Sequence, residues 1–429
     1  MIREYEVQGI GITELAEQFG TPLYVYDGDV LSERLTTLAA ALHERLGVVY
    51  SLKANPNVAV CATLHRAGAG AEVSSLAELL TARRAGVDPR DIVFLGPGKS
   101  AEEIEACLDH GIYAIICESP AELELIDALA GRRGTRAPVA LRVNPSFQTK
   151  GSGLTMGGKA RQFGIDEQHL LDDPGLAARF PHVRLMGVQC YLGTRILSEE
   201  SIARNTEQIL SMAVHLAGVL GFELEMVDVG GGLGVAYFDN ERDLSVPDLA
   251  ALLNPVLAAF ADAHPRTRML MELGRYLTAT AGVYVTRVRY TKQSYGENFA
   301  IADGGTNHHM AAVGIGSFVK RNFPIVALTA MDRPATEAWN ITGPLCTPND
   351  TVGKKVNLPP LKAGDLIGVL RSGAYGPTAS PVLFLSHGYP AEVLVLDGVA
   401  HLVSRRDQPT DLLARQQLPA PAAVAVAGT

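Results

Sequence analysis

Short apolar runs alternate with longer amphipathic stretches over the first two thirds of the chain. This alternation is typical of repeated β-α units. The apolar runs predict strands at Val48–Asn55, Ala71–Ser75, Ile92–Gly96, Ala114–Glu118, Val139–Asn144, Leu185–Gly193, Met226–Gly230 and Leu270–Leu273. The segments between them predict helices at Asn57–Gly68, Leu76–Ala85, Ala101–Asp109, Pro120–Ala130, Ser198–Leu220 and Val246–Ala263.

Eight strands with intervening helices are the number that closes a parallel (β/α)8 TIM barrel. An open, doubly wound sheet gives the same alternation, so the pattern alone fits both architectures. After about Ala281 the runs become short and rich in Val, Ile, Leu and Tyr, as in Gly282–Tyr290 and Asp365–Val369. This change predicts a mostly antiparallel β-domain, to which the opening segment with Leu23–Tyr26 adds a strand.

The chain is therefore expected to have three parts. Residues 28–280 form the α/β barrel, and residues 1–27 together with residues 281–415 form the β-domain. Residues 416–429 are rich in Pro and Ala, which predicts a disordered tail.

Composition narrows the classes of partner. A formal charge of −9 disfavours nucleic acid. The chain has no uninterrupted apolar run long enough to span a bilayer, and its N-terminus lacks the order of a secretory signal, so we expect no membrane partner. The five cysteines show no CxxC spacing, which disfavours a disulfide framework or a zinc site and suits a reducing cytoplasm.

Polar residues at the ends of the predicted strands are the first candidates for chemistry, because barrel active sites lie there. Lys53 closes the apolar run that begins at Val48. A desolvated lysine with a lowered pKa can form a Schiff base, whereas a lysine that reaches the barrel rim would have no chemical role. Both interpretations fit the position of Lys53.

Two further features follow later strands. The triplet Gly230–Gly232 comes directly after the seventh strand, where backbone N–H groups can bind a phosphate, although it could also be a plain turn. Glu272 and Arg275 end the eighth strand. They can bind opposite ends of one ligand, or they can form a salt bridge at the rim.

The β-domain contributes two candidates. Cys346 lies in the segment Gly343–Asp350, whose Gly-Pro and Asp indicate an ordered loop. A cysteine can donate a proton in a dry site, although it is more often an inert apolar residue. Tyr375 follows Ser372-Gly373-Ala374, and its phenol can bind a phosphate or simply pack.

Taken together, these motifs resemble the fold-type III pyridoxal-phosphate (PLP) decarboxylases, the family of diaminopimelate, ornithine and arginine decarboxylases. The resemblance rests on Tyr50–Asn55, Gly230–Gly232, Glu272–Arg275, Gly343–Cys346 and Gly373–Tyr375. It implies PLP on Lys53, the ring nitrogen at Glu272, and a homodimer in which Cys346 enters the partner's site as a proton donor. It further implies a set of residues for the phosphate and the ring, Tyr191, Thr194, Gly231, Gly232, Arg275 and Tyr375, and a set for the substrate, Arg275, Thr347 and Tyr375.

The chain departs from the family pattern around the cofactor. Tyr191 stands where the family commonly has a stacking histidine, and Thr194 stands where it has a serine. Leu273 replaces the usual proline. Stacking and a phosphate hydroxyl are thus both retained, and the acid at Glu272 favours decarboxylation over racemisation, since the related racemases typically have arginine there.

The substrate positions depart further. Thr347 replaces the acid that pairs with the distal amino group of a diamino substrate, and Asn307–Ala311 lacks the arginine of diaminopimelate decarboxylases. Leu385–Pro390 likewise lacks the usual arginine. A distal ammonium would therefore enter the site without a partner, at a cost of several kcal/mol. These departures make free diamino acids poor candidates for the substrate.

The motifs Gly343–Pro348 and Phe384–His387 resemble a branch of the family in secondary metabolism, which includes antibiotic biosynthesis. That branch includes the butirosin-pathway decarboxylase of a carrier-bound glutamate and the decarboxylases of β-amino-acid starter units in macrolactam pathways. We expect an aspartyl, methylaspartyl or glutamyl substrate on an acyl carrier protein. Lys320 and Arg321 could meet the carrier's arm or form a solvated basic turn. The alternatives are a decarboxylase or racemase of a free amino acid, and a non-catalytic PLP-binding regulator. We expect no metal site, because His308 and His309 have no third ligand at a useful spacing and are expected to be loop residues near the site mouth.

Overall fold

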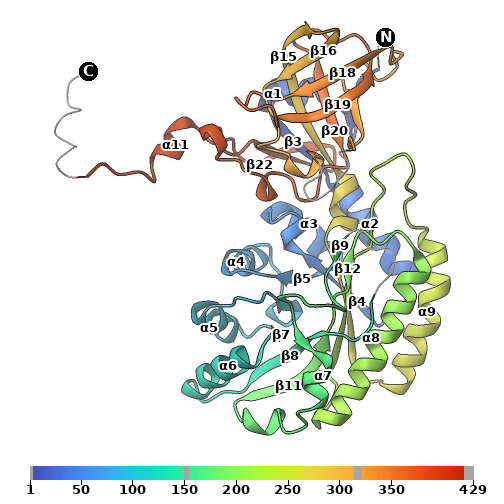
Figure 1. Cartoon of the computed structure of the whole chain (residues 1–429), viewed down its shortest axis with the longest axis vertical. Helices are drawn as coiled ribbons and strands as arrows, with labels where there is room; N and C mark the ends of the chain where they lie inside the picture. The colour runs from blue at the N-terminus through green and yellow to red at the C-terminus, as the bar shows by residue number, and fades with distance from the viewer. Residues whose placement is uncertain (1–2, 149–153, 314–320, 420–429) are drawn as a thin grey trace. The chain divides into compact units, whose positions relative to one another are not determined.

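The computed structural model describes residues 3–148, 154–313 and 321–419. The chain divides into two compact units, one formed by Gly28–Ala281 and the other by Met1–Asp27 with Gly282–Thr429 (Figure 1). Of the predicted tail, residues 420–429 lie outside the described residues.

The first unit is a closed barrel of parallel strands. Its strands in chain order are β4 (Leu46–Ser51), β5 (Gly70–Val73), β6 (Ile92–Phe94), β7 (Ala114–Cys117), β8 (Ala137–Asn144), β11 (Val183–Gln189), β13 (Met226–Gly231) and β14 (Arg268–Leu273). Each strand pairs in parallel with the next, and β14 pairs in parallel with β4. This closure confirms the predicted barrel and excludes the open sheet.

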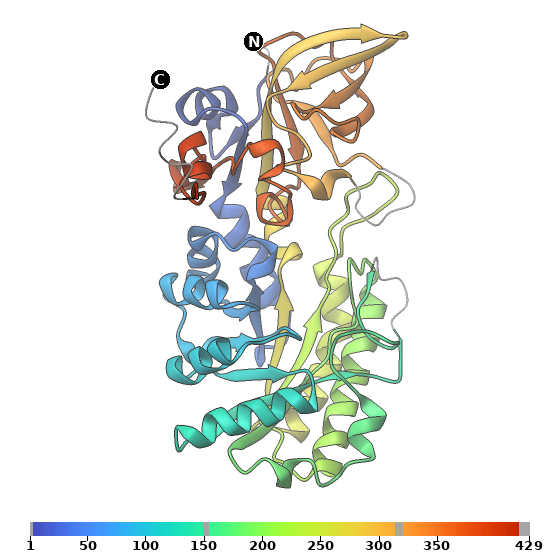
Figure 2. The same ribbon diagram turned by 60° about the vertical axis from the view of Figure 1, so that its left-hand side comes forward.

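Helices surround the barrel strands, as Figure 1 and Figure 2 show. The longer ones are α2 (Gly28–Ala41), α3 (Val58–Arg66), α4 (Leu76–Arg84), α5 (Ala101–His110), α6 (Pro120–Arg132), α8 (Glu199–Leu220) and α9 (Val246–Ala263). A serine Oγ accepts a backbone N–H at the start of five of them, from Ser75, Ser100, Ser119, Ser198 and Ser245. Such caps satisfy N–H groups that the helix itself leaves unpaired, so these serines indicate where the five helices begin. The shorter elements are β9 (Leu154–Thr155), β10 (Ile165–Asp166), α7 (Glu167–Leu171), β12 (Gly193–Thr194) and α10 (Arg275–Thr278).

Helix α9 is long and apolar enough to cross a membrane by length and composition alone, with a mean hydropathy of 1.3 over 18 residues. In the structure it packs as a barrel helix. Leu249, Leu253 and Leu257 are buried on one face, and Asn254 Nδ2 donates to the Ala41 carbonyl of α2 at 2.9 Å. Packing within the barrel unit therefore accounts for one apolar face of this helix, while Leu252 on the same helix is 40% exposed.

The second unit is a mostly antiparallel β-domain, as predicted. Its principal strands are β3 (Leu23–Asp27), β15 (Gly282–Ser294), β16 (Glu297–Ala302), β17 (Ile325–Ala327), β18 (Glu337–Thr342), β19 (Thr351–Leu358), β20 (Leu366–Leu370), β21 (Ala391–Leu396) and β22 (Val399–Ser404). The sheet order is β19-β18-β16-β15-β3-β21-β22, and β20 pairs with both β15 and β17. The pairs β16–β18 and β3–β21 are parallel. The remaining elements are β1 (Glu6–Val7), β2 (Ile10–Gly11), α1 (Ile12–Phe19) and α11 (Pro409–Leu413).

A buried ion pair stabilises the barrel beside β6 and β7. Lys99 Nζ lies 2.6 Å from Glu122 Oε1, and the two side chains are 1% and 7% exposed. The same ammonium donates to the carbonyls of Gly96 and Ile116, both at 2.7 Å. All three contacts lie within the dry interior, so neither charge can be left alone without a large penalty.

Lys99→Met is therefore expected to lower the free energy of unfolding by about 3–5 kcal/mol, because it leaves the Glu122 carboxylate buried without a counter-ion. Lys99→Met combined with Glu122→Gln is expected to recover much of that loss, and urea unfolding measures both. The exposed pair Arg90–Asp88 provides the matched control, since Arg90→Met should cost far less. Equal losses for Lys99→Met and Arg90→Met would contradict this role of the pair.

Candidate active site

Lys53 lies at the C-terminal end of strand β4. The strand stops at Ser51, and Lys53 is the middle residue of a single 3-10 turn, Leu52–Ala54. The backbone N–H of Asn55 closes this turn on the Leu52 carbonyl at 2.9 Å. The predicted strand was thus wrong at its C-terminal end, because the chain turns at once and carries Lys53 out of the sheet.

The Lys53 ammonium has a buried counter-ion. Its Nζ lies 2.9 Å from Glu72 Oε2 in β5, with the side chains 39% and 1% exposed, respectively. The same Nζ lies 5.8 Å from the centre of the Tyr191 ring. A buried carboxylate therefore holds the lysine while its amine stays accessible.

Glu72 is arranged to remain ionised despite its burial. Desolvation acts to raise its pKa, but the charge of Lys53 and hydrogen bonds from Ser51, Lys53 and Ser74 outweigh it, so the pKa is lowered. The Ser74 hydroxyl donates to Glu72 Oε1 at 2.9 Å. Glu72 therefore lies in the candidate site as an anion beside the lysine.

Glu272 on β14 is the second acid of this site. Gln189 on β11 donates its Nε2 to Glu272 Oε1 at 2.7 Å, and Asp228 lies on β13 between these two strands. Burial raises the pKa of Glu272, and the charge of Glu72 adds to this effect. Glu272 was predicted from the sequence, whereas Gln189 and Asp228 were missed, although both interrupt apolar runs as single polar residues.

Arg142 on β8 is also paired within the barrel. Its Nη1 lies 3.0 Å from Glu118 Oε1, and the side chains are 7% and 1% exposed. Glu118 also accepts the backbone N–H groups of Gly96 and Gly164, at 2.9 and 3.2 Å. This network joins the ends of neighbouring strands and fixes the wall of the barrel mouth.

The glycine triplet packs too closely against the neighbouring backbone to carry side chains. A Cβ on Gly231 would lie 1.6 Å from the Glu272 carbonyl oxygen, and a Cβ on Gly232 would lie 2.1 Å from the Gly193 carbonyl oxygen. Gly232 also has a φ of +92°, which favours glycine. Gly193 precedes Thr194 in β12, and the N–H of Ile196 bonds to the Gly232 carbonyl at 2.9 Å. Thr194, Gly231 and Gly232 therefore lie in one compact loop region.

Two arginines and an aromatic loop complete this region. Arg275 opens helix α10, and its Nη1 donates to the Tyr237 hydroxyl at 3.1 Å. Arg195 lies 5.6 Å from the Tyr237 ring and pairs with Glu241 at 2.9 Å. Tyr237, Arg195 and Glu241 were missed from the sequence, although the polar and aromatic loop after the Gly230–Gly232 triplet is a place where barrels build their sites.

The chemistry of these groups fits pyridoxal phosphate. Lys53 supplies an amine that can condense with an aldehyde, and Tyr191 supplies an aromatic face. Backbone N–H groups of a glycine-rich turn such as Gly230–Gly232 can bind a phosphate, and the Arg275 guanidinium is a second candidate for it. Glu272 offers a buried acid for a ring nitrogen.

In the second unit, Cys346 lies in an ordered loop between β18 and β19. Asp350 is 2% exposed and accepts hydrogen bonds from the backbone N–H groups of Thr306 and Leu345, both at 2.8 Å. The N–H of Thr347 bonds to the Leu345 carbonyl at 2.8 Å. Cys346 itself is exposed. The Asp therefore orders the loop, as predicted, and leaves the thiol on its surface.

Tyr375 lies in the same unit after β20, half-buried and with a φ of +55°. His308 and His309 lie in a turn after β16, as predicted for loop residues, but they are only 4% and 0% exposed. Burial lowers their pKa values to about 4 and about 3. His309 Nε2 lies 2.9 Å from Ser372 Oγ. Both histidines are therefore neutral core residues of the β-domain. Within the described ranges, the structure groups no three metal-binding side chains.

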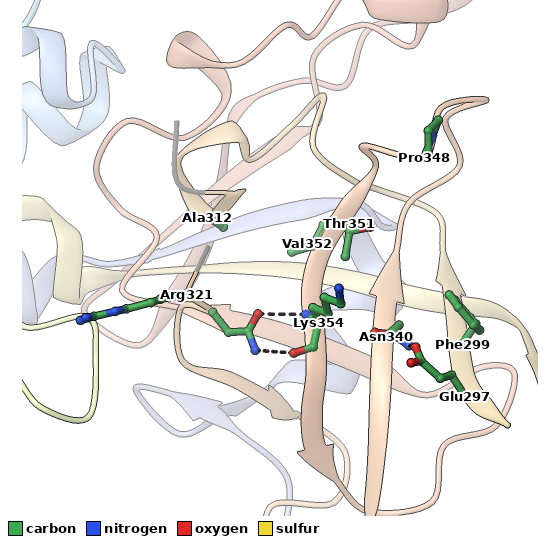
Figure 3. A pocket seen from close by; sticks show the side chains of 10 residues that line it. Glu297, Phe299, Ala312, Arg321, Asn340, Pro348, Thr351, Val352 and Lys354 are labelled. Carbon is green, nitrogen blue, oxygen red and sulfur yellow. Dashed lines mark hydrogen bonds between the residues drawn. The ribbon is translucent and has the colours of Figure 1, made fainter. Parts of the chain in front are cut away.

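A cavity of about 350 Å³ also lies in the β-domain (Figure 3). Asn322 fixes one wall, since its side chain exchanges two hydrogen bonds with the backbone of Lys354, at 2.7 and 2.9 Å. Arg321 lines this cavity and is exposed, as expected for a solvated basic turn. Lys320 lies outside the described residues.

Comparison with known proteins places this geometry in a family context. The model for the pyridoxal-dependent decarboxylases, pyridoxal binding domain, matches residues 29–279. The L-glutamyl-(BtrI acyl-carrier protein) decarboxylase of Niallia circulans is 38% identical over 94% of this chain and 96% of its own length. The diaminopimelate decarboxylase of Aquifex aeolicus is 30% identical over 94% and 93%. The structure of diaminopimelate decarboxylase from Helicobacter pylori complexed with L-lysine superimposes with a TM-score of 0.83 at 29% identity, covering 94% of this chain and 98% of that one.

Proposed function

Because this chain belongs to the family of pyridoxal-dependent decarboxylases, we propose that it removes CO2 from an acidic amino acid bound to an acyl carrier protein. The amino acid is aspartyl, methylaspartyl or glutamyl, joined to the carrier through its side-chain carboxyl. The observation that supports this substrate most strongly is near full-length similarity to a glutamyl-carrier decarboxylase in a chain that lacks the distal acid at Thr347.

The residues of this chain divide the work in the proposed reaction. Pyridoxal phosphate, when bound, supplies an electron sink for the pair left by the departing CO2. Lys53 would hold the cofactor through its amine until the substrate amine takes that position. Glu272 keeps a proton at the ring nitrogen, and Tyr191 covers the ring. Thr194, Gly231, Gly232, Arg275 and Tyr375 hold the phosphate.

The substrate preference follows from charge. A diamino acid brings a distal ammonium, and Thr347 offers it no carboxylate, so its burial would cost several kcal/mol. A thioester at the same place is neutral and needs no counter-ion. Arg275, Thr347 and Tyr375 are the proposed substrate contacts.

Assembly and location are also proposals. We infer a homodimer in which Cys346 of one copy serves the Lys53 of the other, on the family resemblance of the Cys346 loop. A cytoplasmic location suits the five cysteines, all of which are free thiols in the structure.

The direct test is to give purified enzyme aspartyl- or glutamyl-carrier protein and, in parallel, the free acids, diaminopimelate and ornithine. Intact-protein mass spectrometry should show loss of CO2 from the carrier-bound substrate. We expect kcat/KM for the free acids to be lower by about 100-fold or more, because they forgo the binding energy of the carrier and its arm. Turnover of free diamino acids alone would contradict the proposed substrate, and bound PLP without any turnover would favour a regulatory role.

A further inference from the structure

Asp228 is a buried acid that has no role in the proposed reaction. It lies on β13 and pairs in register with Gln189 on β11 and with Leu270 on β14, two residues before Glu272. Asp228 and Gln189 are fully buried, and Glu272 is 4% exposed. Three polar side chains from adjacent strands thus meet in the barrel interior.

This cluster has fewer hydrogen-bond donors than acceptors. Asp228 Oδ1 accepts the Gly230 N–H at 2.9 Å, and Glu272 Oε1 accepts from Gln189 at 2.7 Å. Within the part of the chain that the structure describes, Asp228 Oδ2 and Gln189 Oε1 are buried and receive no hydrogen bond. Both atoms are acceptors, so the cluster has too few donors rather than too few acceptors.

The charges at the barrel mouth also indicate that this cluster carries an additional proton. Glu72 is paired with Lys53, and Glu118 is paired with Arg142. Among the described residues, this leaves the carboxyls of Asp228 and Glu272 without a cationic partner. Two unpaired anions in contact within a dry interior are strongly disfavoured, and one proton removes the conflict.

We propose that Asp228 is a positioning residue that stays protonated and donates its proton to the Glu272 carboxylate, which fixes that carboxylate as the anion facing the ring nitrogen. Asp228 Oδ2 is the atom available for the proton, because Oδ1 already accepts from Gly230. A hydrogen bond to the charged form of Glu272 stabilises that form. The inference rests on the proposed function, since it concerns the role of Glu272 toward the cofactor.

The electrostatics place the proton on Asp228 and not on Glu272. Burial raises the pKa of Asp228 well above its ordinary value, and the charge of Glu272 and the hydrogen bond between the two carboxyls raise it further. Burial and Glu72 raise the pKa of Glu272, but Lys53, Arg142 and Gln189 oppose them. Lys53 and Arg142 therefore stabilise the charged form of Glu272, and the proton resides on Asp228.

Asparagine is the isostere of a protonated aspartate, so Asp228→Asn and Asp228→Ala separate the possibilities. Asn can accept from Gly230 and donate to Glu272, whereas Ala can do neither. Titrating the full chain with pyridoxal phosphate by visible absorbance should give a dissociation constant for Asp228→Asn within a few-fold of the parent. Asp228→Ala should bind roughly ten- to a hundredfold more weakly, because it removes a hydrogen bond to a charged group.

A second readout needs no cofactor. A raised pKa in the folded state means that the folded chain keeps a proton that the unfolded chain loses, so stability falls as pH rises above the ordinary range of Asp. The melting temperature of the parent should therefore fall relative to that of Asp228→Asn between about pH 5 and pH 8. The other charged groups that face the pair, Glu72, Lys53 and Arg142 with Glu118, and the neutral thiol of Cys190 are present in both proteins, so the difference isolates Asp228.

The outcomes distinguish this inference from the proposed function. Asp228→Asn binding the cofactor as weakly as Asp228→Ala, or a melting-temperature difference that does not change with pH, would overturn the protonated Asp228. Asp262→Asn on helix α9 serves as the exposed control and should change neither readout. If the parent itself binds no pyridoxal phosphate, the proposed function fails, whereas the pH dependence of stability still tests the proton on Asp228.

Discussion

Replacing Lys53 by alanine will lower decarboxylation by roughly a thousandfold or more and abolish covalent capture of pyridoxal phosphate. In the proposed function the amine of Lys53, which lies beside Glu72, bonds the cofactor aldehyde. Without it, the cofactor is held only by non-covalent contacts and the exchange with the substrate amine is lost. Borohydride reduction followed by peptide mapping should label Lys53 in the parent and no lysine in the variant.

Alanine at this position also leaves the buried Glu72 without its counter-ion, so loss of folding must be separated from loss of chemistry. Lys53→Arg keeps a cation beside Glu72 but does not offer a neutral amine, because the guanidinium stays protonated. It should fold like the parent and still fail to be labelled. Lys159→Ala, at an exposed lysine of the same unit, is the matched control. Labelling at another lysine, or an aldimine absorbance band that survives in Lys53→Ala, would contradict the assignment.

The barrel could be predicted from sequence because both of its periodicities are local. Strands such as β7 (Ala114–Cys117) are continuous apolar runs, as expected for strands buried on both faces. Helices such as α5 (Ala101–His110) begin with a capping box at Ser100 and Glu103 and end at a left-handed glycine, Gly111. The apolar pattern alone could not distinguish the closed barrel from an open sheet, because the pairing of β14 with β4 joins residues far apart in the chain.

Some residues of the candidate site could likewise be predicted from the sequence, and others could not. Lys53, Glu272 and the Gly230–Gly232 triplet stand out because each ends an apolar run with residues that a core does not tolerate without a reason. Asp228 and Gln189 were missed because each is a single polar residue within a strand, and only the register of β11, β13 and β14 brings them to Glu272. The burial of His308 and His309 was missed because the sequence around Gly304 and Gly305 indicates a loop, whereas the structure packs it beneath Tyr24 and Tyr284.

Cys346→Ala is expected to lower kcat by roughly 10²- to 10⁴-fold, the range over which a positioned general acid accelerates a reaction. The proposed role is delivery of a proton to the substrate carbon after CO2 leaves. The thiol suits it, since Asp350 holds the loop through Thr306 and Leu345 while Cys346 remains exposed at its surface. Because Cys346 does not hold the cofactor, the dissociation constant for pyridoxal phosphate should stay close to that of the parent. An equal loss in cofactor binding would contradict this division of roles.

Mixing the two inactive variants tests whether the site is shared between copies. In a mixed dimer of Lys53→Ala and Cys346→Ala, one of the two sites would combine an intact Lys53 with an intact Cys346, and the other would have lost both. Random exchange of subunits makes about half of the dimers mixed, so the mixture should regain about a quarter of the parent's activity. If Lys53 and Cys346 of the same copy form the site, every site in the mixture carries one defect. Activity no greater than that of the two separate variants would then exclude a site shared between subunits.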